Sequence, residues 1–187
     1  MNKRFCMALT LGILMSACTT TMPTQQASTM STRQAIDANS TATLNNLYRQ
    51  AKGSRELVAK AKGVLVFPSV LTAGLMVGGA YGEGELRIGN QVDGYYKTMT
   101  GSFGFQAGAQ SKAIIFLFMT QDALDHFRQG KGWTAGVDAN VALLTIGADG
   151  SVDTETAKAP VVGFVMTNGG LMFNISLQGT KVSRLDP

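Results

Sequence analysis

The sequence predicts an α+β domain in which N-terminal helices pack on a curved, mostly antiparallel β-sheet, with one further helix. Apolar residues recur at helical spacing over residues 33–62, whereas short apolar, β-prone stretches separated by turns follow from Gly63 onward. Glycine supplies the third observation. The chain has 22 glycines in 187 residues, above the usual share of about 7%. Many lie inside β-prone stretches, where glycine marks bulges, bends or close backbone approach.

The N-terminus has the pattern of a bacterial lipoprotein signal. Lys3 and Arg4 precede an apolar run at residues 5–15. This run is shorter than the roughly 20 residues that span a bilayer, but it has the length of a signal-peptide core. Small residues and then Cys18 follow. The segment resembles the lipobox, with Met15 at the position where leucine is usual.

Lipid attachment at Cys18 would place the protein on a membrane. We expect residues 1–17 to be removed and Cys18 to become the acylated N-terminus, with palmitate among its acyl groups. Two acyl chains anchor a protein stably, where one chain is marginal. Thr19 rather than Asp follows the cysteine. By analogy with other bacterial lipoproteins this favours the outer membrane, on its periplasmic side. The alternative is an ordinary secretory signal cut near Ala17, with Cys18 incidental.

Composition excludes several classes of protein. Cys6 would leave with the signal, so the mature domain has no thiol for a disulfide, a cysteine metal site or a cysteine nucleophile. Charged residues make up only 15% of the chain, and the formal net charge is +4. Because this charge is small and the basic residues do not cluster with aromatic ones, we expect no nucleic-acid partner. The remaining length suits one domain with its own core.

The first structural segments are a tether and two helices. Residues 18–32 are rich in Thr, Ser and Gln and uncharged, so we expect a flexible tether, followed by one domain over residues 33–187. Gly53 interrupts the helical pattern. Ser54 is expected to N-cap the second helix, and Gly63 to end it.

The polar side of these helices is basic. It carries six basic residues against two acidic ones: Arg33, Arg49, Lys52, Arg55, Lys60 and Lys62 against Asp37 and Glu56. A cationic helix beside a lipid anchor suits a surface of anionic headgroups, at about 1 kcal/mol per Lys or Arg. The alternative is a solvated face of a helix that docks on the sheet.

Strands and one helix are expected in the rest of the chain. The first strand, over 63–68, should stop at Pro68. Residues 113–119 are apolar on both faces and predict a central strand. Thr120 is expected to N-cap a helix over 120–129, which ends at Gly130. A turn is expected at residues 89–90, and extended segments at 75–81, 84–88, 94–100, 103–109, 136–146, 161–166, 171–177 and 180–184.

Three possible reactive sites have little support. The Gly-rich segment 78–84 lacks the lysine and the helix that a phosphate loop needs, so we expect bends in a sheet. His126, the only histidine, lacks partners for a metal site or a catalytic triad, and we expect it at the surface. Glu83 and Glu85 could act as paired carboxylates, but we expect them to face solvent. The sequence therefore predicts no enzymatic activity, metal or cofactor.

Ordered motifs over about residues 40 to 185 resemble the SYLF lipid-binding domain. They are Ala61-Lys62-Gly63-Val64-Leu65-Val66-Phe67-Pro68, Gly78-Gly79-x-Tyr81-Gly82-Glu83-Gly84, Gly101-Ser102-x-Gly104-x-Gln106-x-Gly108, Phe118-Met119-Thr120, Gly170-Leu171 and Gln178-Gly179-Thr180.

This resemblance implies a module that binds membrane lipids. In eukaryotic members the lipids are phosphoinositides, engaged through the N-terminal helical region, with links to actin. An exported bacterial protein meets neither in the ordinary course, so lipid binding carries over only as a class. By position, the headgroup residues that the resemblance implies are Arg49, Lys52, Arg55, Lys60 and Lys62. We expect membrane phospholipid as the partner. A structural or assembly role, with an envelope protein as partner, is the alternative.

Overall fold

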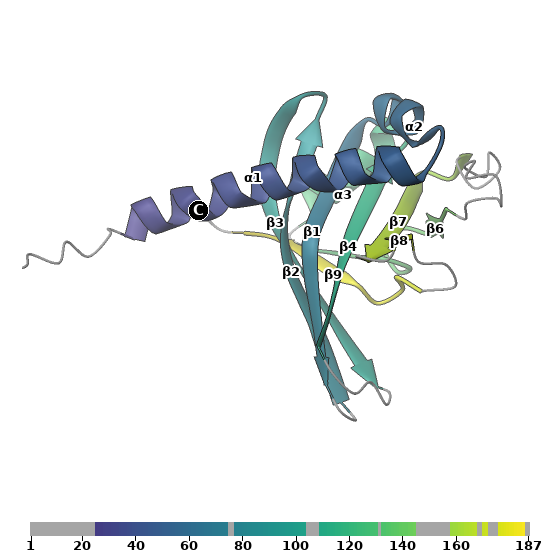
Figure 1. The fold of residues 1–187 in the computed structure, drawn as a ribbon. Coiled ribbons are helices and arrows are strands. Elements are labelled where there is room, and N and C mark those ends of the chain that lie inside the picture. The colour runs from purple at the N-terminus through teal and green to yellow at the C-terminus, as the bar shows by residue number, and fades with distance from the viewer. Residues whose placement is uncertain are drawn as a thin grey trace, which may run out of the picture.

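The computed structural model describes residues 25–74, 77–103, 109–130, 132–144, 158–167, 170–171 and 176–185. Within these described ranges, three helices and a nine-stranded sheet confirm the predicted α+β fold (Figure 1). Cys18 lies outside the described residues, as do most of the expected strand at 103–109 and most of the one at 171–177. The helices are α1 (Gln25–Gln50), α2 (Ser54–Lys60) and α3 (Gln121–Gln129). None of these three is long and apolar enough to cross a membrane.

The sheet is antiparallel except at one pair. Its order is β5-β9-β3-β2-β1-β4-β7-β6, with β8 beside β7, and β6 runs parallel to β7. The strands are β1 (Gly63–Gly74), β2 (Val77–Ile88), β3 (Gln91–Phe103), β4 (Ala109–Phe118), β5 (Trp133–Thr134), β6 (Val141–Leu143), β7 (Val161–Thr167), β8 (Gly170–Leu171) and β9 (Lys181–Arg184).

Each face of the sheet carries its own core. On one face, α1 and α2 cover β1, β4 and β7, with Leu47 and Ile115 fully buried between the layers. On the other face, α3 places Phe127 against Trp133, at 5.7 Å between ring centroids, and against Phe118, at 4.8 Å. Residues 114–118 of β4 are all buried, which confirms the predicted central strand.

Helix ends differ in part from the expectation. The expected domain start at residue 33 falls inside α1, which already includes residues 25–32. No Gly or Pro interrupts residues 25–50, so nothing in this stretch forces the helix to begin later. Thr120 caps α3 as predicted, since its hydroxyl accepts a hydrogen bond from the Ala123 amide.

The expected cap of α2 is wrong. Gly53 is the N-cap, in a left-handed conformation at φ 83° that favours glycine. Ser54 is instead the first helical residue, and its buried hydroxyl donates to the Ala51 carbonyl at 2.6 Å. Gly63 does not end the helix either; α2 stops at Lys60, and Gly63 is the first residue of β1.

The expected end of the first strand is also wrong. β1 continues through Pro68 to Gly74, because a β-bulge accommodates the proline. The bulge exchanges the two faces of the strand. Val66 packs under α1 before it, and Ser69 takes that face after it. The long β1–β2 and β3–β4 hairpins therefore project beyond the helices (Figure 1).

The glycine-rich segment 78–84 lies within one continuous strand, β2, as the prediction of sheet bends implies. Two of its glycines are required by close backbone approach. A Cβ on Gly84 would lie 2.1 Å from the Val66 carbonyl oxygen, and one on Gly82 would lie 2.7 Å from the Ser69 carbonyl oxygen. The bulge and these two glycines together thus allow β1 and β2 to remain paired beyond Pro68.

Candidate functional site

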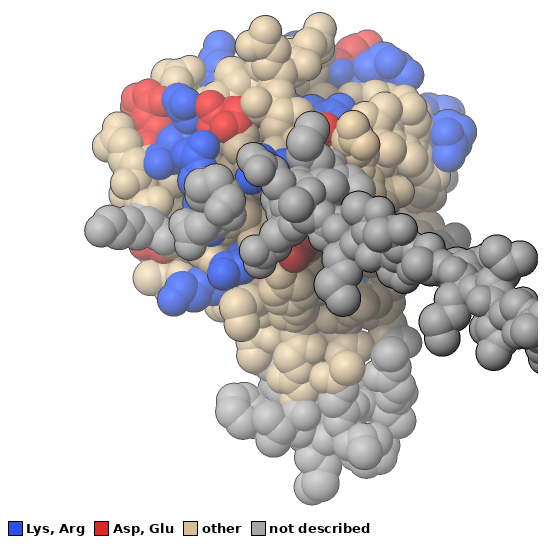
Figure 2. Space-filling view, turned by 90° about the vertical axis from the view of Figure 1, so that its left-hand side faces the viewer, with Lys and Arg blue, Asp and Glu red and all other residues tan. Residues whose placement is uncertain are grey.

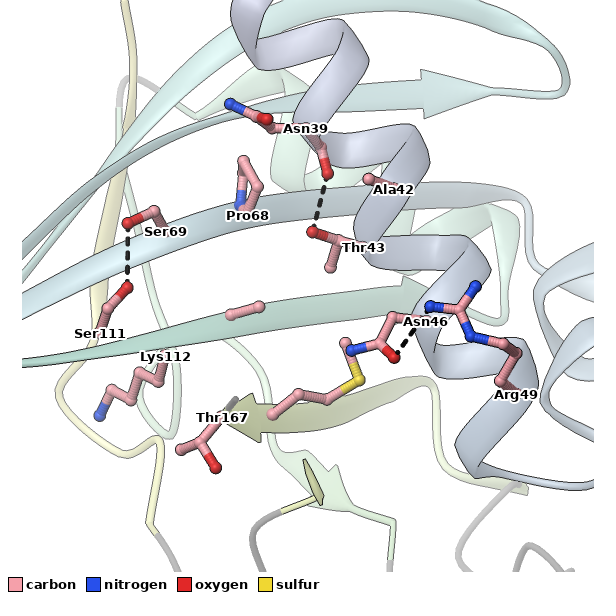
Figure 3. Close-up of a pocket in the computed structure, with 12 residues that line it drawn as sticks. Asn39, Ala42, Thr43, Asn46, Arg49, Pro68, Ser69, Ser111, Lys112 and Thr167 are labelled. Carbon is pink, nitrogen blue, oxygen red and sulfur yellow. Dashed lines mark hydrogen bonds between the residues drawn. The ribbon is translucent and has the colours of Figure 1, made fainter. Parts of the chain in front are cut away.

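A polar groove of about 510 Å³ lies between α1 and the sheet (Figure 3). Helix α1 forms one wall, and the bulged part of β1 and the start of β4 form the other. The polar side chains that line it are Asn39, Thr43, Asn46, Arg49, Ser69, Ser111, Lys112 and Thr167. The groove exists because the bulge at Pro68 turns Ser69 toward the face that α1 covers.

The groove is positively charged. Arg49 and Lys112 are the charged residues in its lining, and no carboxylate is among the lining residues that the structure describes. The salt bridges of the described residues involve neither of them. The Arg49 guanidinium donates only a long hydrogen bond, of 3.3 Å, to Asn46. Partial burial lowers the pKa of Lys112. Among the residues that the structure describes, neither cation therefore has an anionic partner.

Hydroxyl groups complete the site. The Ser69 and Ser111 hydroxyls lie 3.0 Å apart across β1 and β4, and either one can donate to the other. Lys112 follows Ser111 on β4 and is the register partner of Val70, which packs in the core on the α3 face, so its side chain leaves β4 on the side away from these hydroxyls. One of the hydroxyl protons and the Arg49 guanidinium remain as donors toward an anion in the groove. A planar guanidinium and hydroxyl donors are groups that proteins use to hold phosphate or carboxylate oxygens.

Only one of the five predicted headgroup residues lines this groove. That residue is Arg49. Arg55 lies over the Tyr48 ring, 4.3 Å from its centroid. The exposed Lys52, Lys60 and Lys62 belong to the surface around α2, beyond the end of α1. Lys112 was missed because its neighbours belong to an apolar strand, and only the pair Ser111-Lys112 at the head of that strand hints at a polar site.

A second polar cluster fixes α1 to the sheet. Arg87 on β2 donates to Glu85 at 2.5 Å and to the backbone carbonyl of Asp37 on α1 at 3.0 Å. The Tyr95 hydroxyl on β3 donates to the Asp37 carboxylate at 3.0 Å. A further bond joins Arg87 to the Thr41 hydroxyl at 2.8 Å. Because Asn46 and Arg49 lie further along the same helix, this cluster positions one wall of the groove.

The expectation that Glu85 faces solvent is wrong. Its side chain has no exposed area, because α1 covers this part of β2. Burial, and then the nearby Asp37 carboxyl, raise the pKa of Glu85 to about 7, despite the opposing effect of Arg87. Glu83 is partly exposed and accepts a hydrogen bond from the Tyr81 hydroxyl at 2.6 Å. The two carboxylates thus occupy different environments.

The remaining candidate sites show no arrangement for chemistry. His126 is exposed on α3, as predicted. Within the described ranges, no group of three or more His, Cys, Asp or Glu side chains is placed to hold a metal ion. The polar groove is therefore the site that the described geometry favours.

A family model matches part of the chain. No curated protein matches the chain. The family model covers the C-terminal part of the chain, which contributes Ser111 and Lys112 to the groove but not the α1 wall. Residues 99–186 match the model described as Ysc84, Las17-binding protein actin regulator, and this match supports the resemblance of the chain to the SYLF domain family.

Proposed function

We propose that this protein is a lipoprotein of the bacterial cell envelope whose SYLF-like domain binds anionic phospholipid headgroups and catalyses no reaction. The groove between α1 and the sheet carries the proposal, because Arg49 and two hydroxyls line it and no carboxylate is among its described lining residues. A phosphate group matches these donors in charge and in hydrogen bonding.

The exposed cations near the groove have a supporting role in this proposal. Lys52, Lys60 and Lys62 are exposed around the end of α1 and α2, where they add positive charge beyond Arg49. Exposed charges act on a membrane over about 10 Å and are weakened by salt. They therefore attract an anionic surface, while the groove holds one headgroup in place.

Substitution of the two groove cations tests the headgroup site. We expect Arg49→Gln combined with Lys112→Gln to weaken binding to phosphatidylglycerol-containing vesicles about tenfold, since a hydrogen bond to a charged group contributes about 1.5–3 kcal/mol. Vesicle co-sedimentation at low and physiological salt measures the effect. Lys52→Gln with Lys60→Gln is the matched comparison, because it removes two exposed charges and should mainly reduce the salt dependence. A groove variant with both substitutions that binds like the parent protein would overturn the proposed site.

Removal of the acylated residue tests the anchor. We expect Cys18→Ser to release the protein from the membrane fraction, because the loss of two acyl chains removes the stable anchor. Fractionation of inner and outer membranes measures the release, and mass spectrometry of the N-terminal peptide measures the loss of the acyl groups. The proposed location is the periplasmic side of the outer membrane. A Cys18→Ser protein that remained lipidated and membrane-bound would contradict the anchor.

A structural or assembly role with an envelope protein as partner is the second candidate. The description of the matched family names Las17 binding and actin regulation, which are interactions with proteins. In-cell cross-linking distinguishes the two functions. A specific cross-link to one envelope protein that survives Arg49→Gln and Lys112→Gln would favour the protein partner.

A further inference from the structure

A second groove, which is apolar, lies on the same face of the sheet beyond the end that α1 covers. Its volume is about 1020 Å³. Three large apolar side chains in it are exposed to an unusual degree: Leu71 by 58%, Tyr81 by 45% and Met99 by 54%. Figure 2 shows that charged side chains gather on the body of the molecule, whereas the described part of the projecting end is largely uncharged.

These three side chains form one row. Leu71 on β1 is the register partner of Tyr81 on β2, and Tyr81 is the partner of Met99 on β3. Residues directly opposite each other in neighbouring strands point to the same face of the sheet. The row is therefore a continuous apolar strip across three strands.

The next row of residues toward the tip of the hairpins has only small side chains. Ala73, Gly79 and Gly101 are register partners there, so the strip borders a trough without large side chains. Packing does not require these glycines. A Cβ on Gly101 would meet no atom within 4 Å, and one on Gly79 would only touch a backbone oxygen at 3.7 Å. The small residues keep open a space that larger side chains could fill.

The apolar groove adjoins the polar one. Leu71 is the register partner of Ser111, which lines the polar groove, and it lies two residues after Ser69. Neighbouring strands are about 5 Å apart, and residues two apart along a strand are about 7 Å apart. The polar groove and the apolar trough therefore meet within the reach of a single amphiphile. Lys181, the register partner of Met99, borders the far side of the trough.

We propose that the apolar groove binds the acyl chains of the phospholipid whose anionic headgroup occupies the polar groove. This inference rests on the proposed function, and it adds a hydrocarbon subsite to it. The floor strands β1 and β2 are paired on both sides, so the trough offers apolar side chains rather than free backbone groups. Hydrocarbon chains need no hydrogen bonds and fit such a surface, while Arg49 in the adjoining polar groove and Lys181 at the border of the trough match the phosphate in charge.

A chain-length series tests this subsite. The full chain carrying Cys18→Ser serves as the parent, so that no acyl group of the protein itself competes. The probes are glycerol 3-phosphate, dibutyryl phosphatidylglycerol and dihexanoyl phosphatidylglycerol, each kept monomeric, with affinities from NMR titration. We expect affinity to rise with chain length, by up to about fourfold for each methylene that the groove covers fully.

Three variants test whether the apolar groove causes the rise in affinity with chain length. Leu71→Ser and Met99→Ser should reduce the rise with chain length while leaving the affinity for glycerol 3-phosphate unchanged. Gly101→Val should do the same by filling the trough, and valine suits a strand better than glycine. The matched control is Val137→Ser, since Val137 is 79% exposed on the turn after β5 and lies outside the groove.

The outcomes separate this inference from the proposed function. If glycerol 3-phosphate binds through Arg49 but affinity does not rise with chain length, the acyl subsite is wrong and the headgroup site stands. If the rise disappears in Leu71→Ser and Gly101→Val while Arg49→Gln and Lys112→Gln change nothing, the acyl subsite stands and the headgroup site is wrong. A lipid-free dimer that Leu71→Ser dissociates would show that a second copy covers the groove, and would overturn the inference.

Discussion

Replacement of Arg87 by methionine is expected to lower the free energy of unfolding by about 3–5 kcal/mol at pH 8, because removal of one partner leaves a buried charge uncompensated. Arg87 donates to Glu85, to the Asp37 carbonyl and to the Thr41 hydroxyl. Methionine keeps much of the aliphatic volume but none of these donors. The Glu85 carboxylate would then remain buried under α1 without a cation.

Urea unfolding followed by the fluorescence of Trp133, the single tryptophan, measures this loss. Arg128→Met is the matched control. Arg128 also pairs with a carboxylate, Asp93, but its own side chain is 42% exposed. Exposed ion pairs contribute about 0–1 kcal/mol, so the control should cost far less. Equal losses in the two variants would mean that the Arg87 cluster does not hold α1 to the sheet.

The Arg87→Met substitution also tests whether the position of α1 affects the proposed headgroup site. Helix α1 contributes Asn46 and Arg49 to the polar groove, and Arg87 is one of the residues that bond this helix to β2. We therefore infer that a protein without Arg87 loses headgroup affinity even under conditions in which it remains folded. Loss of position, rather than loss of charge in the groove, would be the cause.

Much of the fold was predictable from local signals. The central strand followed from an unbroken apolar run at residues 113–119, and α3 followed from the Thr120 cap, an amphipathic segment and Gly130. These elements depend on the sequence within a few residues. The glycine-rich segment 78–84 was correctly placed in a sheet for the same reason, although the backbone oxygens that demand Gly82 and Gly84 come from another strand.

The predictions that were wrong concern features that depend on contacts between residues distant in sequence. Alternation along β2 places Glu83 and Glu85 on one face, but it cannot show that α1 covers Glu85. Pro68 appeared to end a strand because the bulge that tolerates it requires two neighbouring strands. Lys112 joins Arg49 only through packing of α1 on β4. A site that is assembled from a helix and from residues of the three strands β1, β4 and β7 leaves no spacing pattern in the sequence.

The pH dependence of stability is the second large effect, and it arises from the groups around Glu85. One oxygen of this carboxylate accepts from Arg87, and the other is buried without a hydrogen-bond partner. The Asp37 carboxyl faces it from α1, so a proton held between the two carboxyls would satisfy that oxygen. Tyr95 on β3 and Arg33 on α1 complete the surroundings. The pKa of Tyr95 is raised to about 12, so it does not titrate near neutral pH.

The direction of the pH dependence follows from the raised pKa of Glu85, which is about 7 in the folded protein against its ordinary value of 4.5. The folded state binds this proton more tightly than the unfolded state does. The contribution of the bound proton to stability is therefore complete below pH 4.5 and is lost as pH rises through about 7. We expect the free energy of unfolding to fall across this window by about 3 kcal/mol in total. Urea unfolding at intervals from pH 4.5 to 8 measures the slope.

Glu85→Gln isolates the cause of this slope. The amide donates to the Asp37 carboxyl as the shared proton does, so the variant should show little slope and should exceed the parent protein in stability at pH 8. Glu83→Gln is the matched control, because Glu83 lies two residues away on the same strand but bonds to Tyr81 in a partly exposed position. It should keep the parental slope. A slope that persists in Glu85→Gln would show that other groups hold the proton, and that α1 is not fixed to the sheet by a protonated carboxyl pair.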